Sequence, residues 1–237
     1  MQKKGYLYMR QTIKTAFMST IPVLTGYLAL GFGFGILLSS NGFGILLAFA
    51  MSLFIYAGSM QYVAIGLLAG GAPLITVAVT TLIVNARHLF YGVSMLGKYK
   101  DTGKIKPYLI FALTDETYSL LCTDNSKIAP ENKKKYYFLV SILNHSYWIT
   151  GSVLGATVGS LVDFNSEGID FVLTALFVTI FIEQWLGTKK HIPALIGVFA
   201  SVISIIIFSS ENFLIPAMLI IALLLCLYKE KDGIKEE

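Results

Sequence analysis

Six ionisable side chains lie inside otherwise apolar stretches of the sequence, and they are the residues best placed to do chemistry. They are Arg87, His88, Asp115, Glu116, His145 and Glu183. Burying such a group in hydrocarbon costs at least about 2.5–3.5 kcal/mol, so each requires a partner, a proton or access to water. In combination they have the chemistry to recognise a charged solute or to carry a proton.

Arg87 supports two interpretations. Gly97, near the end of its apolar segment, is about 15 Å away along a helix, which is close to the limit that an arginine side chain can snorkel. Arg87 therefore faces protein or water. In one interpretation it forms a structural ion pair with Asp115 or Glu116. In the other, its planar guanidinium binds a substrate carboxylate through two hydrogen bonds.

Asp115 and Glu116 are sequence neighbours, so on a helix their side chains point about 100° apart and cannot both face the same partner. One carboxylate can pair with Arg87 while the other binds a cation. We predict that Asp115 faces the substrate. A protonatable carboxylate at this depth also suits proton coupling, for which Glu116 is a candidate.

Three further residues are candidates for proton coupling, namely Glu183, His145 and His88. Glu183 precedes Trp185 closely and is equally well interpreted as an interfacial carboxylate beside an aromatic anchor. His145 is either a proton relay or a histidine whose hydrogen bonds are satisfied near the end of its helix.

A polar run from Tyr56 to Gln61 interrupts another apolar segment. Its residues Gly58 and Ser59 predict a break in the helix, since lipid cannot satisfy exposed backbone groups. The N-terminus of a half-helix here would present amide donors to an anionic group. The predicted substrate-binding set is therefore Arg87, Asp115, Gly58, Ser59 and Gln61.

The segments that carry these residues are membrane-spanning by composition. From Thr15 to Ala86 there is no Asp, Glu, Lys, Arg or His, and the whole chain is 55% hydrophobic with a mean hydropathy of +0.70. Charged residues make up 14%, well below the quarter that is usual in globular domains. We predict an all-α polytopic membrane protein that forms a single transporter domain over residues 1–237.

A span of about 20 residues crosses a bilayer, and apolar run lengths predict eight transmembrane helices, with seven as the competing count. The predicted spans are 17–38, 43–69, 73–97, 107–123, 137–161, 168–187, 192–208 and 213–228.

With both termini in the cytoplasm, most basic connections fall inside, as the positive-inside rule prefers. The 98–106 connection, which carries Lys98, Lys100, Lys104 and Lys106, falls outside and violates the rule. The violation suggests that one of the first three segments is broken or re-entrant and does not cross fully.

A weak internal repeat relates residues 16–123 to residues 137–228, unless shared composition alone produces the matches. The halves are parallel if all eight spans cross, and inverted if an early segment is re-entrant. Within the repeat, Gly31 and Gly35 correspond to Gly151 and Gly155, with Gly159 one turn further. This spacing predicts close packing of two helices.

The sequence contains no Walker A motif, no H-E-x-x-H and no G-x-S-x-G, so it offers nothing for ATP-driven transport or for an intramembrane hydrolase. We expect no cofactor, no metal site and no enzymatic activity. Cys122 and Cys226 lie in apolar runs and are assigned no role.

These same residues resemble the AzlC family, also called the LIV-E family, the large permease subunits of branched-chain amino-acid exporters. The matching stretches are Ile21-Pro22 with Gly26-Tyr27, Tyr56 to Gln61, Asn85 to Gly92, Leu113 to Glu116, Asn144 to Trp148 and Glu183 to Leu186. The resemblance implies export of leucine, isoleucine, valine and analogues across a bacterial inner membrane. It also implies a small AzlD-like membrane subunit as partner, and no nucleic acid.

The candidate residues suit such a substrate. Asp115 can accept hydrogen bonds from the ammonium group, while Arg87 or the Gly58-Ser59 backbone can donate to the carboxylate. Proton coupling is a hypothesis that rests on the intramembrane carboxylates and the missing ATP site. The alternatives are an ion channel or ion transporter that uses the same charges, and a structural subunit whose ion pairs are purely internal.

Overall fold

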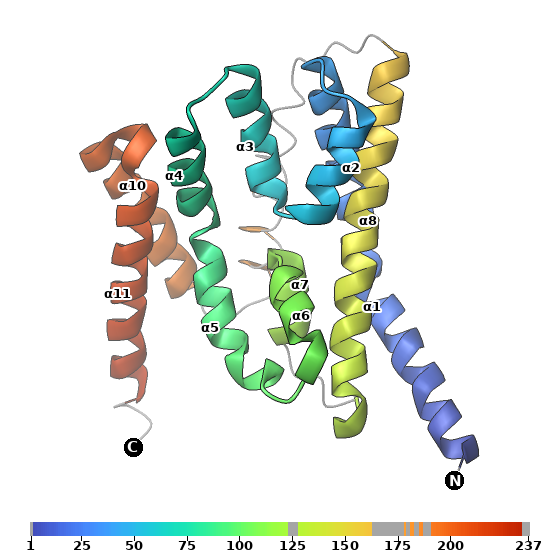
Figure 1. Cartoon of the computed structure of the whole chain (residues 1–237). Coiled ribbons are helices and arrows are strands. Elements are labelled where there is room, and N and C mark those ends of the chain that lie inside the picture. Colours follow the sequence, from blue (N-terminus) through green and yellow to red (C-terminus); the bar gives the residue numbers. More distant parts are fainter. Residues whose placement is uncertain are drawn as a thin grey trace. The chain divides into compact units, whose positions relative to one another are not determined.

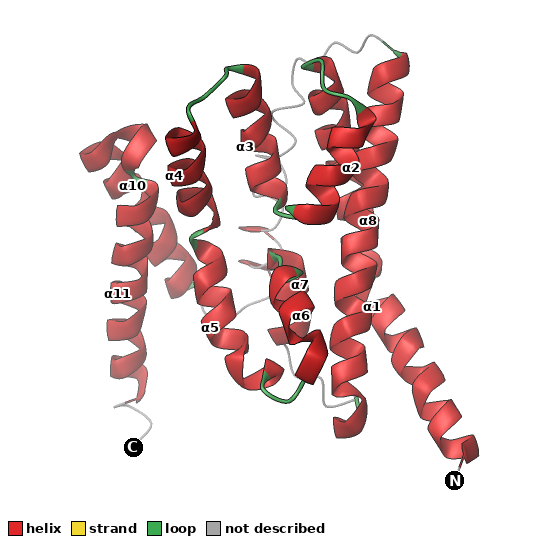
Figure 2. Ribbon diagram, in the orientation of Figure 1, coloured by secondary structure: helices red, strands yellow, loops and turns green. Residues whose placement is uncertain are grey.

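The computed structural model describes residues 2–122, 128–162, 178, 181–182, 185–186 and 191–233. Across these residues the secondary structure is helical, with no strand (Figure 2), which agrees with the predicted all-α class. The chain divides into two compact units, residues 1–81 with 87–173 and residues 82–86 with 174–237. The first unit carries most of the candidate site residues.

Two long helices of the first unit, α1 (Gln2–Ser40) and α8 (Lys133–Leu161), run in the same direction side by side (Figure 1). Glycines let their backbones touch. A Cβ on Gly35 would lie 2.7 Å from the Gly155 carbonyl carbon, and one on Gly151 would lie 2.8 Å from the Tyr27 carbonyl oxygen. The predicted role of this glycine spacing in helix packing is confirmed.

The predicted span 43–69 is in fact two helices, α2 (Ile45–Phe54) and α3 (Gly58–Ala69). The chain reverses between them at Tyr56, whose φ of 47° lies in the left-handed region. Ser52 and Gln61 would be about 13.5 Å apart along a continuous helix. Instead the Gln61 amide donates to the Ser52 hydroxyl at 3.3 Å. The α2–α3 hairpin therefore returns to the end where it began, and the predicted break at Gly58 is confirmed.

The predicted span 107–123 is likewise two helices, α6 (Lys106–Phe111) and α7 (Asp115–Cys122), which follow the short helix η1 (Gly103–Ile105). Lys98, in the last turn of the preceding helix, donates from Nζ to the carbonyls of Leu121 and Cys122 at 2.5 and 2.8 Å. The last turn of α7 therefore lies beside the end of that helix. The α6–α7 hairpin approaches from the end opposite to the α2–α3 hairpin (Figure 1).

The predicted span 73–97 is a bent pair, α4 (Leu74–Asn85) and α5 (Arg87–Tyr99), which meet at Ala86 with a bend of 49°. The short helix η2 (Pro130–Asn132) leads into α8. In the second unit, α10 (Ile192–Asn212) and α11 (Leu214–Gly233) cover the last two predicted spans. The predicted span 168–187 lies largely outside the described residues.

The count of eight spanning helices is not reached in the described part of the chain. Two helical stretches there are long and apolar enough to cross a membrane, Met9–Ser40 and Ile192–Ser209, and the bent α4–α5 pair would make a third. Part of the difference is that turns at Tyr56 and at Ala112 to Thr114 divide the runs 43–69 and 107–123 into two short helices each. In addition, α8 and α11, which cover the predicted spans 137–161 and 213–228, are not among the stretches that are long and apolar enough. The predicted span 168–187 is largely outside the described residues.

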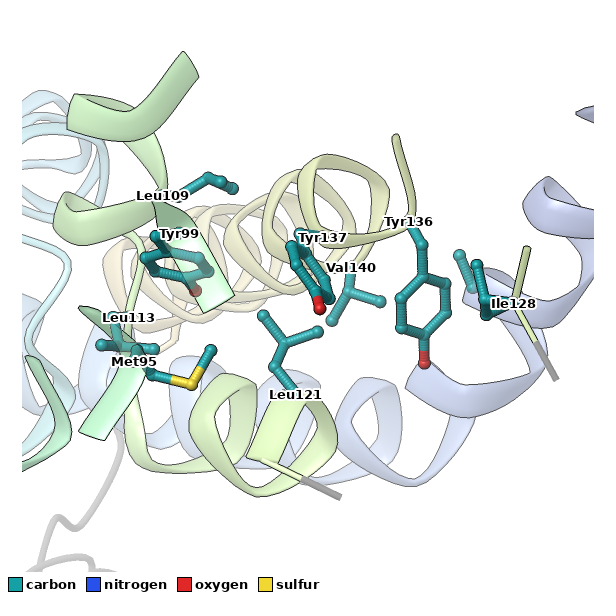
Figure 3. Packing of buried hydrophobic residues seen from close by; sticks show 10 residues of the cluster. Met95, Tyr99, Leu109, Leu113, Leu121, Ile128, Tyr136, Tyr137 and Val140 are labelled. Carbon is teal, nitrogen blue, oxygen red and sulfur yellow. The ribbon is translucent and has the colours of Figure 1, made fainter. Parts of the chain in front are cut away.

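One end of the first unit is closed by a buried apolar cluster (Figure 3). It joins Ala16 of α1, Tyr99 of α5, Leu109 of α6, Leu121 of α7 and Tyr136 of α8, among others. The cluster brings together the end of α5, the beginning of α8 and the open ends of the α6–α7 hairpin. It thereby anchors α7 and α5, whose other ends reach the candidate site.

Candidate functional site

The N-terminal residues of α3, α5 and α7 meet at the candidate site. Arg87, the first residue of α5, places Nη1 2.5 Å from Asp115 Oδ2, and Asp115 is the first residue of α7. The same guanidinium donates from Nη2 to the hydroxyl of Ser59, in the first turn of α3, at 2.5 Å. Each helix N-terminus carries a partial positive charge, so together they favour an anionic group.

Local sequence accounts for two of these helix starts. Gly58 begins α3 directly against Trp148, since a Cβ there would lie 3.1 Å from the indole ring. Thr114 caps α7, because its hydroxyl accepts the backbone N–H of Thr117 at 3.3 Å. Asp115 and Glu116 then occupy the first turn of α7, where the helix dipole stabilises negative charge.

Arg87 and Asp115 form the ion pair that one interpretation of the sequence predicted. Their side chains remain 26% and 23% exposed, so neither is fully enclosed by the protein. A guanidinium that already binds a carboxylate and a hydroxyl has the geometry to bind the carboxylate of a ligand in their place. The role of either residue in substrate binding stays a prediction.

Glu116 has different partners from its neighbour. Its Oε2 accepts a hydrogen bond from the Tyr27 hydroxyl at 2.6 Å, and that hydroxyl lies 2.7 Å from the Thr114 hydroxyl. Thr114 in turn contacts the Thr117 hydroxyl, to which the Asn144 amide donates. The two adjacent carboxylates therefore lie in separate networks, as their helical spacing predicted.

Gln61, a predicted substrate-binding residue, lies in a different, fully buried network. Its Oε1 accepts from the Trp148 indole N–H at 2.9 Å and its amide donates to Ser52. These bonds tie α3 to α8 and to α2. The contacts assign Gln61 a scaffolding position, while Gly58 and Ser59 lie at the helix start that the sequence predicted.

His145 is buried, with both ring nitrogens engaged. Nε2 lies 3.1 Å from the Ser52 carbonyl oxygen and Nδ1 lies 3.2 Å from the Tyr108 hydroxyl. The ring also stacks on Tyr56, with centroids 4.2 Å apart. These contacts fit a neutral histidine that donates to the carbonyl and accepts from the phenol. Satisfied hydrogen bonds were one of the two interpretations of the sequence, but His145 lies in the middle of α8 and not near its end.

The two remaining candidates are His88 and Glu183. His88 follows Arg87 on α5 and packs edge-on against Tyr91, with ring centroids 5.8 Å apart. Glu183 lies outside the described residues. Both stay predictions as proton-coupling residues.

The structure adds Tyr27, Tyr56 and Thr114 to the site. Thr114 carried a recognisable signal, because a threonine just before two acidic residues is a helix N-cap pattern. Tyr27 and Tyr56 gave no such signal, since tyrosines are common in membrane segments. Only the long-range packing of α1 and the α2–α3 turn against α7 brings them to Glu116. Among the described residues, no group of three His, Cys, Asp or Glu side chains is arranged to hold a metal ion.

Comparison with known proteins places this site in a family. A family model described as AzlC protein matches residues 22–162. The branched-chain amino acid transport protein AzlC of Bacillus subtilis is 48% identical over 93% of this chain and 86% of its own length. An uncharacterized membrane protein of Helicobacter pylori is 43% identical over 93% of this chain and 96% of its own.

A more distant relative is the inner membrane protein YgaZ of Escherichia coli, which is 28% identical over 77% of this chain and 78% of its own length. No solved structure matches the chain. The family match covers α2 to α8 and the second half of α1, and so includes every residue of the Arg87–Asp115 and Glu116–Tyr27 networks. The chain therefore belongs to the AzlC family of membrane transport proteins.

Proposed function

We propose that this protein exports branched-chain amino acids from the bacterial cytoplasm across the inner membrane. The observation that carries the proposal is the meeting of the α3, α5 and α7 N-termini around the partly exposed Arg87–Asp115 pair. The Arg87 guanidinium can donate hydrogen bonds to a substrate carboxylate, and the adjacent Asp115 carboxylate can accept them from a substrate ammonium group. The name of the Bacillus subtilis relative supports the substrate class.

In this proposal the substrate carboxylate binds the Arg87 guanidinium and the Ser59 hydroxyl, while the ammonium group binds Asp115. The substrate thus replaces each partner of the ion pair with a group of the same charge. Aliphatic side chains line much of the surrounding helices and suit a leucine, isoleucine or valine side chain.

The proposed orientation places both termini in the cytoplasm. Lys98, Lys104 and Lys106 belong to a connection that packs near Lys134, because a Cβ on Gly103 would lie 3.4 Å from Lys134 Nζ. The first half of α1 and the basic start of α8 lie at the same end of the first unit (Figure 1), where Lys135 Nζ is 3.7 Å from Met9 Sδ. If α2–α3 and α6–α7 are re-entrant, the 98–106 connection no longer violates the positive-inside rule.

Two further parts of the proposal concern energy and partner. Efflux is driven by the proton gradient, since partly buried carboxylates lie in the first unit and the sequence has no ATP-binding motif. A small AzlD-like subunit of about four spans completes the exporter, as the family resemblance implies.

The test is efflux of preloaded labelled valine and leucine from cells that express the chain. Expression with and without the small subunit measures the need for a partner, and collapse of the proton gradient measures coupling. We expect efflux that requires the partner and falls when the gradient is collapsed. Absence of efflux despite verified membrane insertion of both proteins would contradict the proposed substrate.

A further inference from the structure

Glu116 is a partly buried carboxylate whose hydrogen-bond donor among the described side chains is a neutral hydroxyl. The Tyr27 hydroxyl donates to its Oε2 at 2.6 Å, and Tyr27 and Thr114 are themselves buried at 4% and 7% exposure. No cation among the described residues forms a salt bridge with it, in contrast to Asp115. A carboxylate held only by hydroxyl groups in an apolar region gains most from binding a cation of its own.

The surroundings of Glu116 decide what that cation can be. Titratable groups from four neighbouring segments act on it: Tyr27 of α1, Tyr56 of the α2–α3 turn, Arg87 and Tyr91 of α5, and Asp115 of α7. His145 of α8 reaches it only through the stacked Tyr56 ring. A metal ion would need several more oxygen ligands, whereas a proton needs only one carboxylate oxygen.

A proton at this position is accommodated without breaking the network. The protonated carboxyl group can donate to the Tyr27 oxygen, and the Tyr27 hydrogen then points to the Thr114 oxygen 2.7 Å away. Thr114 caps α7, whose first residue is Asp115. The charge on Glu116 is thereby connected to the start of the helix that holds the substrate-facing carboxylate.

We propose that Glu116, which Tyr27 connects to Thr114, binds the proton that drives transport, while the adjacent Asp115 keeps its salt bridge with Arg87. The proton enters and leaves at a Glu116 carboxylate oxygen, with no change in the covalent structure. Arg87 lies within electrostatic range of both carboxylates, so the charge on Glu116 alters how strongly Arg87 attracts an anionic group. This inference rests on the proposed amino-acid transport.

The test uses the full-length protein in membrane vesicles, together with the small subunit if wild-type transport requires it. Two rates are measured, namely valine efflux driven by an imposed pH gradient and valine–valine exchange without a gradient. A pH-sensitive dye trapped in the vesicles reports proton movement upon valine addition. Glu131→Gln, which neutralises the exposed carboxylate of η2, is the matched control.

We expect Glu116→Gln to exchange valine measurably while pH-driven efflux falls at least tenfold relative to exchange and the dye signal disappears. Asp115→Asn should lose both rates together. Glu131→Gln should match the wild type. If Glu116→Gln retains gradient-driven efflux, or loses exchange and efflux in equal proportion although inserted and folded, Glu116 is not the proton site.

Tyr27→Phe provides an independent test, because it removes the hydroxyl that donates to Glu116 and keeps the ring that packs against Trp148. We expect the pH of half-maximal efflux to move, which a purely structural role would not cause. An unchanged pH profile, or stimulation by a sodium gradient in place of a pH gradient, would overturn the assignment. Absence of both rates in the wild type would instead refute the proposed function.

Discussion

At the scale of single residues, the site separates charges that are adjacent in sequence. Asp115 pairs with Arg87, while Glu116, one residue later, turns to Tyr27. The sequence predicted this separation from helix geometry, and it predicted the ion pair as one of two interpretations. It missed Tyr27 and Tyr56, because nothing local distinguishes a tyrosine that contacts a carboxylate 89 residues away from one that packs in a membrane.

The buried hydrogen bond between Trp148 and Gln61 stabilises the fold. Trp148→Phe removes the N–H that donates to Gln61 Oε1 and leaves a fully buried acceptor without that partner. We expect a loss of about 1–3 kcal/mol in the free energy of unfolding in detergent. The valine KM of the folded protein should change little.

The control for this prediction is the double variant Trp148→Phe with Gln61→Leu. It replaces both hydrogen-bonding partners with apolar groups, so part of the stability should return. If the single variant is as stable as the wild type, the hydrogen bond between Trp148 and Gln61 does not stabilise the fold. That result would contradict the structural role and favour the predicted role of Gln61 in substrate binding.

At the scale of elements, apolar run length located the helices but did not show where they turn back. The α2–α3 break was predictable because glycine, serine and glutamine interrupt an apolar run. The α6–α7 break was not, since it lies in Ala112-Leu113-Thr114 and depends on capping by Thr114 and on Lys98 binding the last carbonyls of α7. Such tertiary contacts override the local apolar pattern.

The α1–α8 contact supports a prediction at this scale. Gly155→Ala would place a Cβ 2.7 Å from the Phe32 Cα, where backbone atoms cannot move aside. We expect destabilisation of about 1–3 kcal/mol. Thermal unfolding of the purified protein in detergent measures it.

Gly66→Ala is the matched control, because a Cβ on Gly66 of α3 meets nothing within 4 Å. This variant should be as stable as the wild type or gain up to about 1 kcal/mol from helix propensity. Equal effects of the two substitutions would show that α1 and α8 do not approach as closely as described.

At the scale of the whole molecule, the first unit combines continuous helices with two hairpins that approach from opposite ends and carry their turns toward Arg87. The α1 and α8 helices run in the same direction. The glycines that match between them in the weak internal repeat therefore lie on parallel helices. The sequence suggested a re-entrant early segment from charge distribution alone. The sequence did not suggest a second re-entrant segment. With both the α2–α3 and the α6–α7 hairpins reversing, the 98–106 connection lies at the same end as Lys14 and Lys133 to Lys135.

This topology predicts which surface connections face the cytoplasm. In a variant with Cys122 and Cys226 replaced by serine, a cysteine at the exposed Lys100 or Glu131 should resist a membrane-impermeant maleimide in intact cells. A cysteine at the exposed Asn41, between α1 and α2, should react. Labelling of the Lys100 position from outside would restore the topology in which all eight segments cross.

The central claim is that Arg87 binds the carboxylate of a transported amino acid, and the Arg87→Lys variant tests it most directly. Lysine keeps the positive charge beside Asp115 but lacks the planar pair of donors. The measurement is the initial rate of labelled valine efflux per inserted protein. We expect the rate to fall at least about tenfold, equivalent to about 1.4 kcal/mol. Efflux close to the wild-type rate would show that Arg87 serves only as an internal ion-pair partner.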